Sequence, residues 1–282
     1  MTVFVKQNEL KDFLKSYWKE KKSIGFVPTM GALHQGHLSL MSESIKQNSL
    51  TVVSIFVNPT QFNNPEDLKK YPRTLDADVE KINSLSKNII VYAPSVEDIY
   101  EGKTESTSFK YDGLEFQMEG KHRPGHFDGV GTIVKKLFEI VQPNNAYFGE
   151  KDFQQLQIVK KLVEKYKIPV KINGCKIHRE TNGLAMSSRN ERLSKEERSQ
   201  ASFIFKTLSE AAKLFTTKSA QEVTTWVNQQ FKKQTMFELE YFEIADEATL
   251  LECKRKSKNK KYRAFIAVFV NNIRLIDNIS LK

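Results

Sequence analysis

The sequence predicts an α/β fold, in which a doubly wound parallel sheet is followed by a smaller α+β domain. Short apolar runs such as Ile24–Val27 and Leu50–Val57 alternate with segments of helical periodicity, and this alternation is typical of a parallel sheet covered on both faces. From Ser194 the order changes, because two helical segments precede three strand-like ones. We therefore expect a first domain of residues 1–177 and a second domain of residues 178–282.

The individual elements follow from the spacing of apolar residues. Apolar positions three and four apart indicate helices, which are expected at 8–21, 38–45, 74–85, 130–141, 153–166, 194–215 and 220–233. Short apolar runs indicate strands, which are expected at 24–27, 50–57, 88–93, 146–148, 170–177, 239–244, 263–270 and 273–279. Residues 3–5 are expected to form a short strand or coil. Two further segments are assigned: Thr107–Tyr111 is predicted as an edge strand and Phe116–Phe127 as a polar, glycine-bearing loop.

The composition is that of a globular protein of the cytoplasm. Of the 282 residues 39% are apolar, and no apolar run reaches the roughly 20 residues that span a bilayer. The first residues lack the basic-then-apolar pattern of a signal peptide. Cys175 and Cys253 are far apart in the sequence, so we expect free thiols in a reducing compartment. We therefore expect a cytoplasmic location and no membrane partner.

The net charge of +10 allows two interpretations, a surface that binds nucleic acid or a surface of solvated lysines. The lysines are scattered along the chain, and their densest group, Lys254–Lys261, has no interleaved aromatic residues. Aromatic side chains are what stack on bases in many nucleic-acid sites. We therefore favour solvated lysines, expect no nucleic-acid partner, and predict that Lys254–Lys261 is an exposed turn between strands.

The first chemical signal is Val27–His37, where a buried strand turns into a helix. Such a turn offers free backbone N–H groups and the positive end of a helix dipole to an anion. Gly31 and Gly36 would let a ligand approach the backbone closely. Because His34 and His37 are three residues apart, both imidazoles are expected to face one ligand and to stabilise charge on a phosphate.

Two more polar clusters follow predicted strands, Gly149–Asp152 and Met186–Arg189. Ligands of open parallel sheets lie beyond the carboxyl ends of the strands. Lys151 would place a positive charge on a phosphate; the alternative is a charged first turn of a helix, but a lysine there opposes the helix dipole. The two serines and Arg189 would donate hydrogen bonds to phosphate oxygens. Alone this tetrapeptide is better explained as an ordinary loop, and it gains weight only beside the other clusters.

Amides and other histidines give weaker signals. Asn58 and Gln61 would suit a small substrate with hydroxyl and carboxylate groups, and the alternative is a turn that caps the next helix. His122 and His126 are interpreted as loop or helix-terminal residues, and His178 as a packing or edge position. The sequence has neither the ligand spacing of a structural zinc site nor the glycine-rich Gly-Lys-Ser/Thr loop of many nucleotide-binding proteins.

Taken together, these segments resemble the pantothenate synthetase (pantoate–β-alanine ligase) family, within the superfamily of class I synthetases and nucleotidyltransferases. The similar blocks follow one another in the family's order: Pro28–His37, Phe56–Phe62, Tyr71–Thr74, Arg123–Phe127, Phe148–Gln155 and Gly183–Asn190. The first block alone is typical of the whole superfamily, whereas the full set is specific. The resemblance implies a Rossmann-like first domain and a C-terminal lid domain that carries Met186–Arg189.

The resemblance further implies an AMP-forming ligase that uses ATP to join pantoate to β-alanine. The pantoate carboxylate attacks the α-phosphate of ATP, giving pantoyl adenylate and pyrophosphate; the amine of β-alanine then displaces AMP and forms pantothenate. Mg²⁺ is implied as the cofactor that accompanies ATP. Asp78 is a possible contact for the ion, although Ala77 precedes it where some members have a second acid. A homodimer formed through the first domain is also implied.

Roles for single residues follow from the same resemblance. His34, His37 and Lys151 are expected to act on the phosphates, with His37 as the proton donor. Gln61, Gln155 and Asn58 are expected to bind the substrates, pantoate above all. Asp152 would contact the ribose and the backbone near His178 the adenine. The residues expected to bind ATP are Met30, Gly31, Ala32, Leu33, His34, Gln35, Gly36, His37, Gly149, Glu150, Lys151, Asp152, His178, Met186, Ser187, Ser188 and Arg189.

Two other functions remain as alternatives. Another nucleotidyltransferase of the same superfamily would need a nucleobase pocket for its acceptor, which the amides of Gln61 and Gln155 suit poorly. A basic RNA-binding protein that uses the second domain would need lysines and arginines along one face with aromatic residues among them, and the sequence shows no such stripe.

Overall fold

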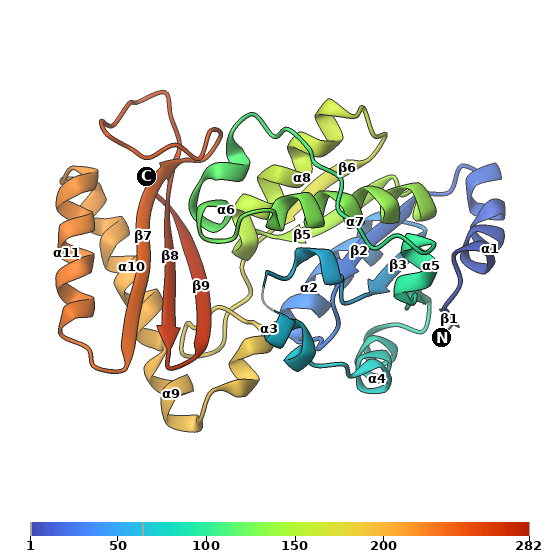
Figure 1. Cartoon of the computed structure of the whole chain (residues 1–282), viewed down its shortest axis with the longest axis horizontal. Helices are drawn as coiled ribbons and strands as arrows, with labels where there is room; N and C mark the ends of the chain where they lie inside the picture. The colour runs from blue at the N-terminus through green and yellow to red at the C-terminus, as the bar shows by residue number, and fades with distance from the viewer. Residues whose placement is uncertain (1, 64, 282) are drawn as a thin grey trace. The chain divides into compact units, whose positions relative to one another are not determined.

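The computed structural model describes residues 2–63 and 65–281. Contacts divide the chain into two compact units (Figure 1). Unit 1 consists of Met1–Glu115, Glu119–Glu150 and Gln155–Lys176, and unit 2 of Phe116–Met118, Lys151–Gln154 and Ile177–Lys282. The segment Lys151–Gln154 therefore belongs to unit 2, although it lies well before the rest of that unit in the sequence.

Unit 1 is built on a parallel sheet of six strands in the order β1-β4-β3-β2-β5-β6. The strands are β1 (Thr2–Phe4), β2 (Ile24–Thr29), β3 (Leu50–Ile55), β4 (Ile89–Tyr92), β5 (Asn145–Gly149) and β6 (Lys171–Cys175). In the centre, Ile24 of β2 is paired with Leu50 of β3, and the register continues to Thr29 and Ile55. The apolar runs that predicted these two strands are buried, and the predicted doubly wound sheet is confirmed.

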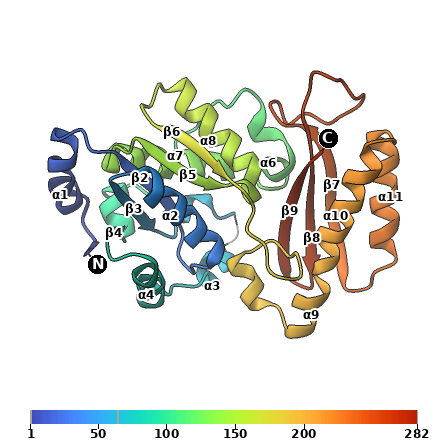
Figure 2. The same cartoon turned by 180° about the vertical axis from the view of Figure 1, so that it is seen from behind.

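Helices cover both faces of this sheet. The longer ones are α1 (Gln7–Lys19), α2 (Gln35–Gln47), α4 (Leu75–Leu85), α7 (His126–Val141) and α8 (Phe153–Lys165). The shorter ones are α3 (Pro65–Lys70), α5 (Val96–Tyr100) and α6 (Met118–His122), with 3₁₀ turns η1 (Pro59–Gln61), η2 (Leu114–Phe116) and η3 (Glu150–Asp152). Helix α7 lies over one face of the sheet in Figure 1, and α2 lies over the opposite face in Figure 2.

Unit 2 is the expected smaller α+β region. Its antiparallel sheet has the order β7-β8-β9, with β7 (Phe237–Asp246), β8 (Tyr262–Val270) and β9 (Ile273–Leu281). The helices are α9 (Lys195–Gln200), α10 (Ser202–Phe215) and α11 (Ala220–Lys232), preceded by the 3₁₀ turn η4 (Ser188–Arg192). Side chains such as Leu208, Val227 and Ile266 are buried between the helices and the sheet.

One predicted strand is wrong, and one predicted loop is partly helical. Thr107–Tyr111 forms no strand, because side chains of α7 bind its backbone in place of a neighbouring strand. The N–H of Thr107 donates to Thr132 Oγ1 (2.8 Å), and that of Phe109 donates to Asp128 Oδ1 (3.0 Å). The predicted loop Phe116–Phe127 contains the short helix α6 and the first two residues of α7, His126 and Phe127.

The single helix predicted over 194–215 is two helices, α9 and α10. The first begins at a capping box, in which Ser194 Oγ accepts from the N–H of Glu197 (3.2 Å) and the Glu197 carboxylate accepts from the N–H of Ser194 (2.7 Å). The lysine-rich segment Lys254–Lys261 lies between β7 and β8 and is exposed, as predicted.

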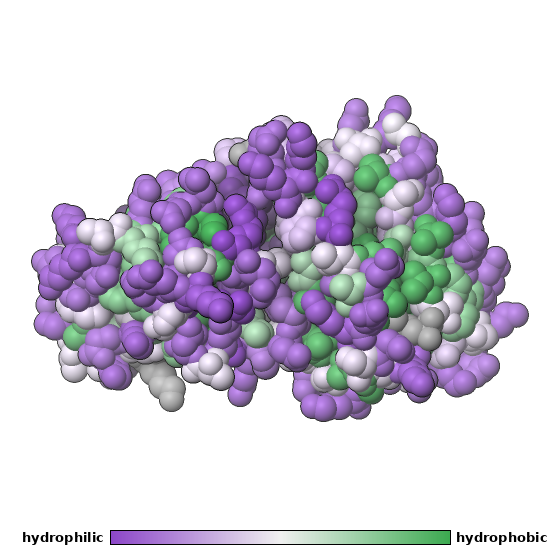
Figure 3. Space-filling model, turned by 90° about the horizontal axis from the view of Figure 1, so that it is seen from below, coloured by the Kyte–Doolittle hydropathy of each residue, from purple (hydrophilic) through white to green (hydrophobic). Residues whose placement is uncertain are grey.

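The face drawn in Figure 3 is mostly hydrophilic, with hydrophobic side chains in smaller groups. Within residues 2–63 and 65–281, no helix has the length and apolar character needed to cross a membrane.

Candidate functional site

The histidine-bearing turn between β2 and α2 has an unusual backbone. Gly31 and Ala32 both have positive φ values, 84° and 49°, in a region that glycine enters freely and alanine at a cost. Thr29 helps to hold the turn, because its Oγ1 donates to the carbonyl of Ser54 (2.7 Å) and accepts from the N–H of Gly31 (3.2 Å). The turn is therefore fixed to both central strands.

Asp78 of α4 is the main anchor of this turn. Its carboxylate accepts from the N–H of Ala32 (2.9 Å) and the N–H of Leu33 (2.7 Å), and Thr74 Oγ1 donates to it as well (3.1 Å). The side chain is 0% exposed, and such bonds to a charged acceptor are among the stronger ones in proteins. The prediction that this turn presents free N–H groups to an anion is therefore wrong for Ala32 and Leu33.

The two imidazoles point their Nδ1 atoms into the turn. His34 Nδ1 accepts from the N–H of Gly36 (3.1 Å), and His37 Nδ1 accepts from the N–H of His34 (3.3 Å), so that together they cap α2. The rings are stacked, with centroids 4.0 Å apart and planes at 29°. A nitrogen that accepts an N–H carries no proton, so each neutral ring holds its proton on Nε2. The turn thus provides two Nε2–H donors.

Asn58 and Gln61 follow β3 and differ in role. Asn58 is 0% exposed, its Oδ1 accepts from the Tyr100 hydroxyl (2.5 Å), and its Nδ2 donates to Gln61 Oε1 (3.2 Å) and to the carbonyl of Gly129 (3.1 Å). Burial raises the pKa of the Tyr100 phenol, which keeps this donor protonated. Asn58 therefore acts as a support for Gln61.

Gln61 joins the end of β3 to the histidine-bearing turn. Its Nε2 contacts Met30 Sδ at 2.8 Å. His126 Nδ1 lies 2.8 Å from the carbonyl oxygen of Gln61. Because a carbonyl oxygen only accepts hydrogen bonds, His126 carries a proton on Nδ1. His126 is the first residue of α7, as predicted, but its contact with Gln61 was not foreseen. No local pattern could have revealed it, since the two residues are 65 positions apart.

Lys151 and its neighbours connect β5 to α8. Gly149 ends β5, Glu150–Asp152 form the turn η3, and α8 begins at Phe153. The Lys151 side chain is 18% exposed, and its Nζ lies 3.7 Å from Asp152 Oδ2. Gln155, in the first turn of α8, is half-buried. The structure therefore has a charged turn directly before the start of a helix.

The loop Met186–Arg189 is held at both ends within unit 2. The N–H of Met186 donates to the carbonyl of His178 (3.0 Å), and Ser187 Oγ accepts from the N–H of Arg189 (3.2 Å). Asn190, which follows the loop, is buried and donates to Glu180 Oε1 (2.7 Å) and to the carbonyl of Ala185 (3.1 Å). The His178 side chain is exposed, so the packing role predicted for it is wrong.

Residues 2–63 and 65–281 contain no cluster of three or more His, Cys, Asp or Glu side chains that could hold a metal ion. Asp78, the suggested contact for Mg²⁺, binds donors of the protein with both carboxylate oxygens.

Cys175 and Cys253 are free thiols. Burial raises the pKa of Cys175 to about 11, so that it stays protonated at neutral pH and is a poor nucleophile.

Comparison with known proteins decides the family. The sequence model described as pantoate-beta-alanine ligase matches residues 2–280. The chain belongs to this family. A pantothenate synthetase of Flavobacterium psychrophilum is 74% identical over 282 residues, the whole of both chains, and one of Christiangramia forsetii is 53% identical over the same length.

Solved structures agree with this assignment. A pantothenate synthetase from Thermus thermophilus has a TM-score of 0.91 and 37% identity, and the match covers 99% of each chain. The pantoate-beta-alanine ligase from Francisella tularensis, complexed with beta-gamma ATP and beta-alanine, has a TM-score of 0.81 and 36% identity, with 99% of this chain and 97% of that one covered. The expected activity, AMP-forming condensation of pantoate with β-alanine, is confirmed as that of the family, and neither alternative function is supported.

The role of Asp78 leads to a stability prediction. In Asp78→Asn, one carboxylate oxygen becomes an NH₂ group that faces backbone N–H donors, so a buried donor loses its acceptor. We expect the free energy of unfolding to fall by about 1–3 kcal/mol, and pantoyl-adenylate formation to slow because the turn shifts. Urea unfolding and pyrophosphate release measure the two effects. Asp76→Asn, on the exposed side of α4, is the matched control; an Asp78→Asn protein as stable and active as that control would contradict the anchoring role.

Proposed function

We propose that the histidine-bearing turn catalyses the first step of the ligation, the attack of the pantoate carboxylate on the α-phosphate of ATP. One carboxylate oxygen bonds to the phosphorus as the bond to pyrophosphate breaks, and negative charge grows on the phosphate oxygens. The observation that carries the proposal is the pair of stacked imidazoles, whose Nδ1 atoms accept backbone N–H groups. Donors that are fixed before the reaction stabilise such charge without reorganisation, and here they are the Nε2–H groups of His34 and His37.

The remaining ATP contacts are proposed from the other loops. Lys151 donates to a phosphate oxygen and Asp152 binds the ribose. Gly149 and Glu150, which precede them in the chain, also contact ATP. The loop Met186–Arg189 supplies hydroxyl and guanidinium donors to the phosphates. Its bond to the carbonyl of His178 keeps the two segments adjacent, which supports an adenine contact through the backbone there. The other residues of the histidine-bearing turn, Met30–Leu33, Gln35 and Gly36, lie along the nucleotide.

Pantoate is proposed to bind at Gln61 and Gln155, with Gln61 also close to β-alanine. Gln61 suits this role because Asn58 and Met30 contact its side-chain amide and His126 contacts its backbone carbonyl, so the amide loses little entropy when a substrate binds. In the second step the neutral amine of β-alanine attacks the acyl carbon, the carbon–oxygen bond to AMP breaks, and the amine proton passes to solvent. Asn58 contributes to this site by orienting Gln61.

Mg²⁺ is proposed to enter with ATP. Asp78 is poorly suited to hold the ion, because both of its carboxylate oxygens already accept hydrogen bonds from the protein. When bound to the triphosphate, the ion would neutralise part of its charge. We further propose that the enzyme is cytoplasmic, that it forms a homodimer through its first domain, and that residues 1–177 bind ATP and pantoate while residues 178–282 act as a lid.

Omission of single substrates tests the proposed reaction. ATP with pantoate should release pyrophosphate only up to the amount of enzyme, because pantoyl adenylate stays bound, and addition of β-alanine should give continuous AMP formation. The binding of ATP and beta-alanine by the Francisella tularensis relative supports this expectation. Pyrophosphate release that needs no pantoate, or that depends on a mononucleotide acceptor, would contradict it.

A further inference from the structure

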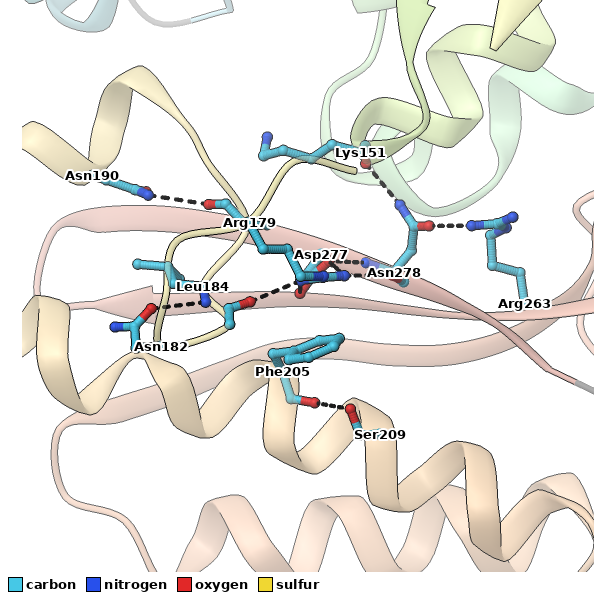
Figure 4. A network of polar contacts seen from close by, with 12 residues as sticks. Lys151, Arg179, Asn182, Leu184, Asn190, Phe205, Ser209, Arg263, Asp277 and Asn278 are labelled. Atoms are coloured by element: carbon cyan, nitrogen blue, oxygen red, sulfur yellow. Dashed lines mark hydrogen bonds and ion pairs between the residues drawn. The ribbon is translucent and has the colours of Figure 1, made fainter. Parts of the chain in front are cut away.

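The main chain of Lys151 is held by a buried asparagine of the unit 2 sheet. Asn278, on β9, donates from its Nδ2 to the carbonyl of Lys151 at 2.8 Å (Figure 4). Asn278 is 1% exposed, and its strand is paired with β8 at this point, opposite Phe265. The residue thus reaches from a rigid sheet to a segment that lies 127 positions away in the sequence.

Arg263 fixes which way the Asn278 amide points. The guanidinium of Arg263 donates to Asn278 Oδ1 at 2.6 Å, and its Nε donates to Glu247 Oε1 at 2.9 Å. A guanidinium has donors and no acceptor, so the oxygen of the amide must face Arg263 and the NH₂ group must face Lys151. Arg263 is itself buried, and rotation of the amide would place two donors against each other.

Neighbouring contacts make this arrangement stiff. Arg263 lies over the ring of Phe153, with 4.0 Å from its Cζ to the ring centroid, and Phe153 also packs against Phe265. On the strand itself, Asp277 binds Arg179 through two hydrogen bonds of 2.6 and 2.9 Å. The segment that begins at Lys151 is therefore fixed by a polar contact at Lys151 and by ring packing two residues later.

We propose that Asn278 is a positioning residue, which fixes the main chain of Lys151 and thereby directs its ammonium group towards the phosphates of ATP. The proposal rests on the proposed function of Lys151. A lysine side chain has four rotatable bonds and a compact charge, so its reach is set by where its backbone is held. Misplacement of a catalytic group by about 1 Å costs up to about a hundredfold in rate, which makes a contact that fixes the backbone important for catalysis.

Asn278→Asp isolates this contact. The variant has nearly the same shape and keeps an oxygen for Arg263, but it replaces the NH₂ donor with an oxygen that repels the Lys151 carbonyl. We expect kcat/KM for pantoyl-adenylate formation with respect to ATP to fall by about ten- to a hundredfold. The control is Arg274→Met, which removes an arginine of the same strand, β9, and breaks its ion pair with Glu240 of β7; it should leave adenylation unchanged. Wild-type kinetics in Asn278→Asp would overturn the proposal.

A double-mutant cycle separates positioning from other effects. If Asn278 acts through Lys151, then Asn278→Asp should cause no further loss in a Lys151→Met background. An equal loss in both backgrounds would overturn the proposal while leaving the role of Lys151 intact. Normal adenylation by Lys151→Met alone would instead overturn that role, and the positioning proposal with it.

A second variant covers the case in which Asn278→Asp does not fold. Arg263→Lys retains the positive charge but cannot reach both Glu247 and Asn278, so the amide is free to turn. We expect a smaller loss in the same kinetic constant, which again disappears when Lys151 is replaced by Met. A loss that persists in that background would contradict the proposal.

Discussion

Replacement of His37 by Ala is expected to slow pantoyl-adenylate formation by about a hundredfold or more. Loss of one pre-positioned donor to developing charge typically costs a factor of this size. The variant also removes the Nδ1 acceptor of the N–H of His34, so it disturbs the start of α2 together with the chemistry. Single-turnover release of pyrophosphate measures the catalytic loss, and urea unfolding measures the structural one.

His37→Asn separates the two roles of the ring. The Oδ1 atom of asparagine can accept the N–H of His34 in place of Nδ1, but the side chain has no donor at the position of Nε2. We therefore expect adenylation as slow as in His37→Ala, with a free energy of unfolding within about 0.5 kcal/mol of the wild type. Adenylation at nearly the wild-type rate in His37→Asn would show that the Nε2–H group is not used.

Replacement of Lys151 by Met is expected to give the second large effect. Methionine retains an apolar stem of similar length and removes the charge that we assign to a phosphate. We expect KM for ATP to rise and kcat for adenylation to fall, because the charge acts on ATP both before and during bond breaking. A combined loss of about a hundredfold in kcat/KM, some 2.7 kcal/mol, is consistent with the removal of one such interaction.

The control for charge alone is Lys160→Met. Lys160 is an exposed lysine of α8, the helix that begins just after Lys151, and it has no proposed contact with ATP. Its replacement should leave both constants unchanged. If Lys160→Met and Lys151→Met lowered kcat/KM equally, the effect would come from the net charge of the protein and the assignment of Lys151 would be wrong.

The local patterns of this sequence predicted most of the fold, because they act over a few residues. The runs Ile24–Val27 and Leu50–Val57 indicated the two central strands, and the structure places them side by side. The errors arose where distant side chains decide the local structure. Thr107–Tyr111 has the composition of a strand, but Thr132 and Asp128 bind its backbone, and neither is recognisable as a partner from the sequence.

In the candidate site, too, local sequence patterns indicated some features, whereas contacts between distant residues decided others. The histidine spacing indicated both imidazoles, whereas the orientation of each ring depends on which backbone N–H its Nδ1 accepts. Asp78 was considered only as a possible metal contact, because a carboxylate in a sequence does not reveal what it binds. Its two bonds to the histidine-bearing turn depend on how α4 packs. Asn278 gave no signal at all, since its partner Lys151 lies in a distant segment.

The most direct test of the mechanism follows oxygen from pantoate labelled with ¹⁸O in its carboxylate. If the carboxylate attacks the α-phosphate, the oxygen that forms the bond to phosphorus leaves with AMP, and the other remains in the new amide. Mass spectrometry of the products should therefore find one ¹⁸O in AMP and one in pantothenate at each turnover. AMP without the label would contradict attack by pantoate at the α-phosphate, and with it the role that we assign to His34 and His37.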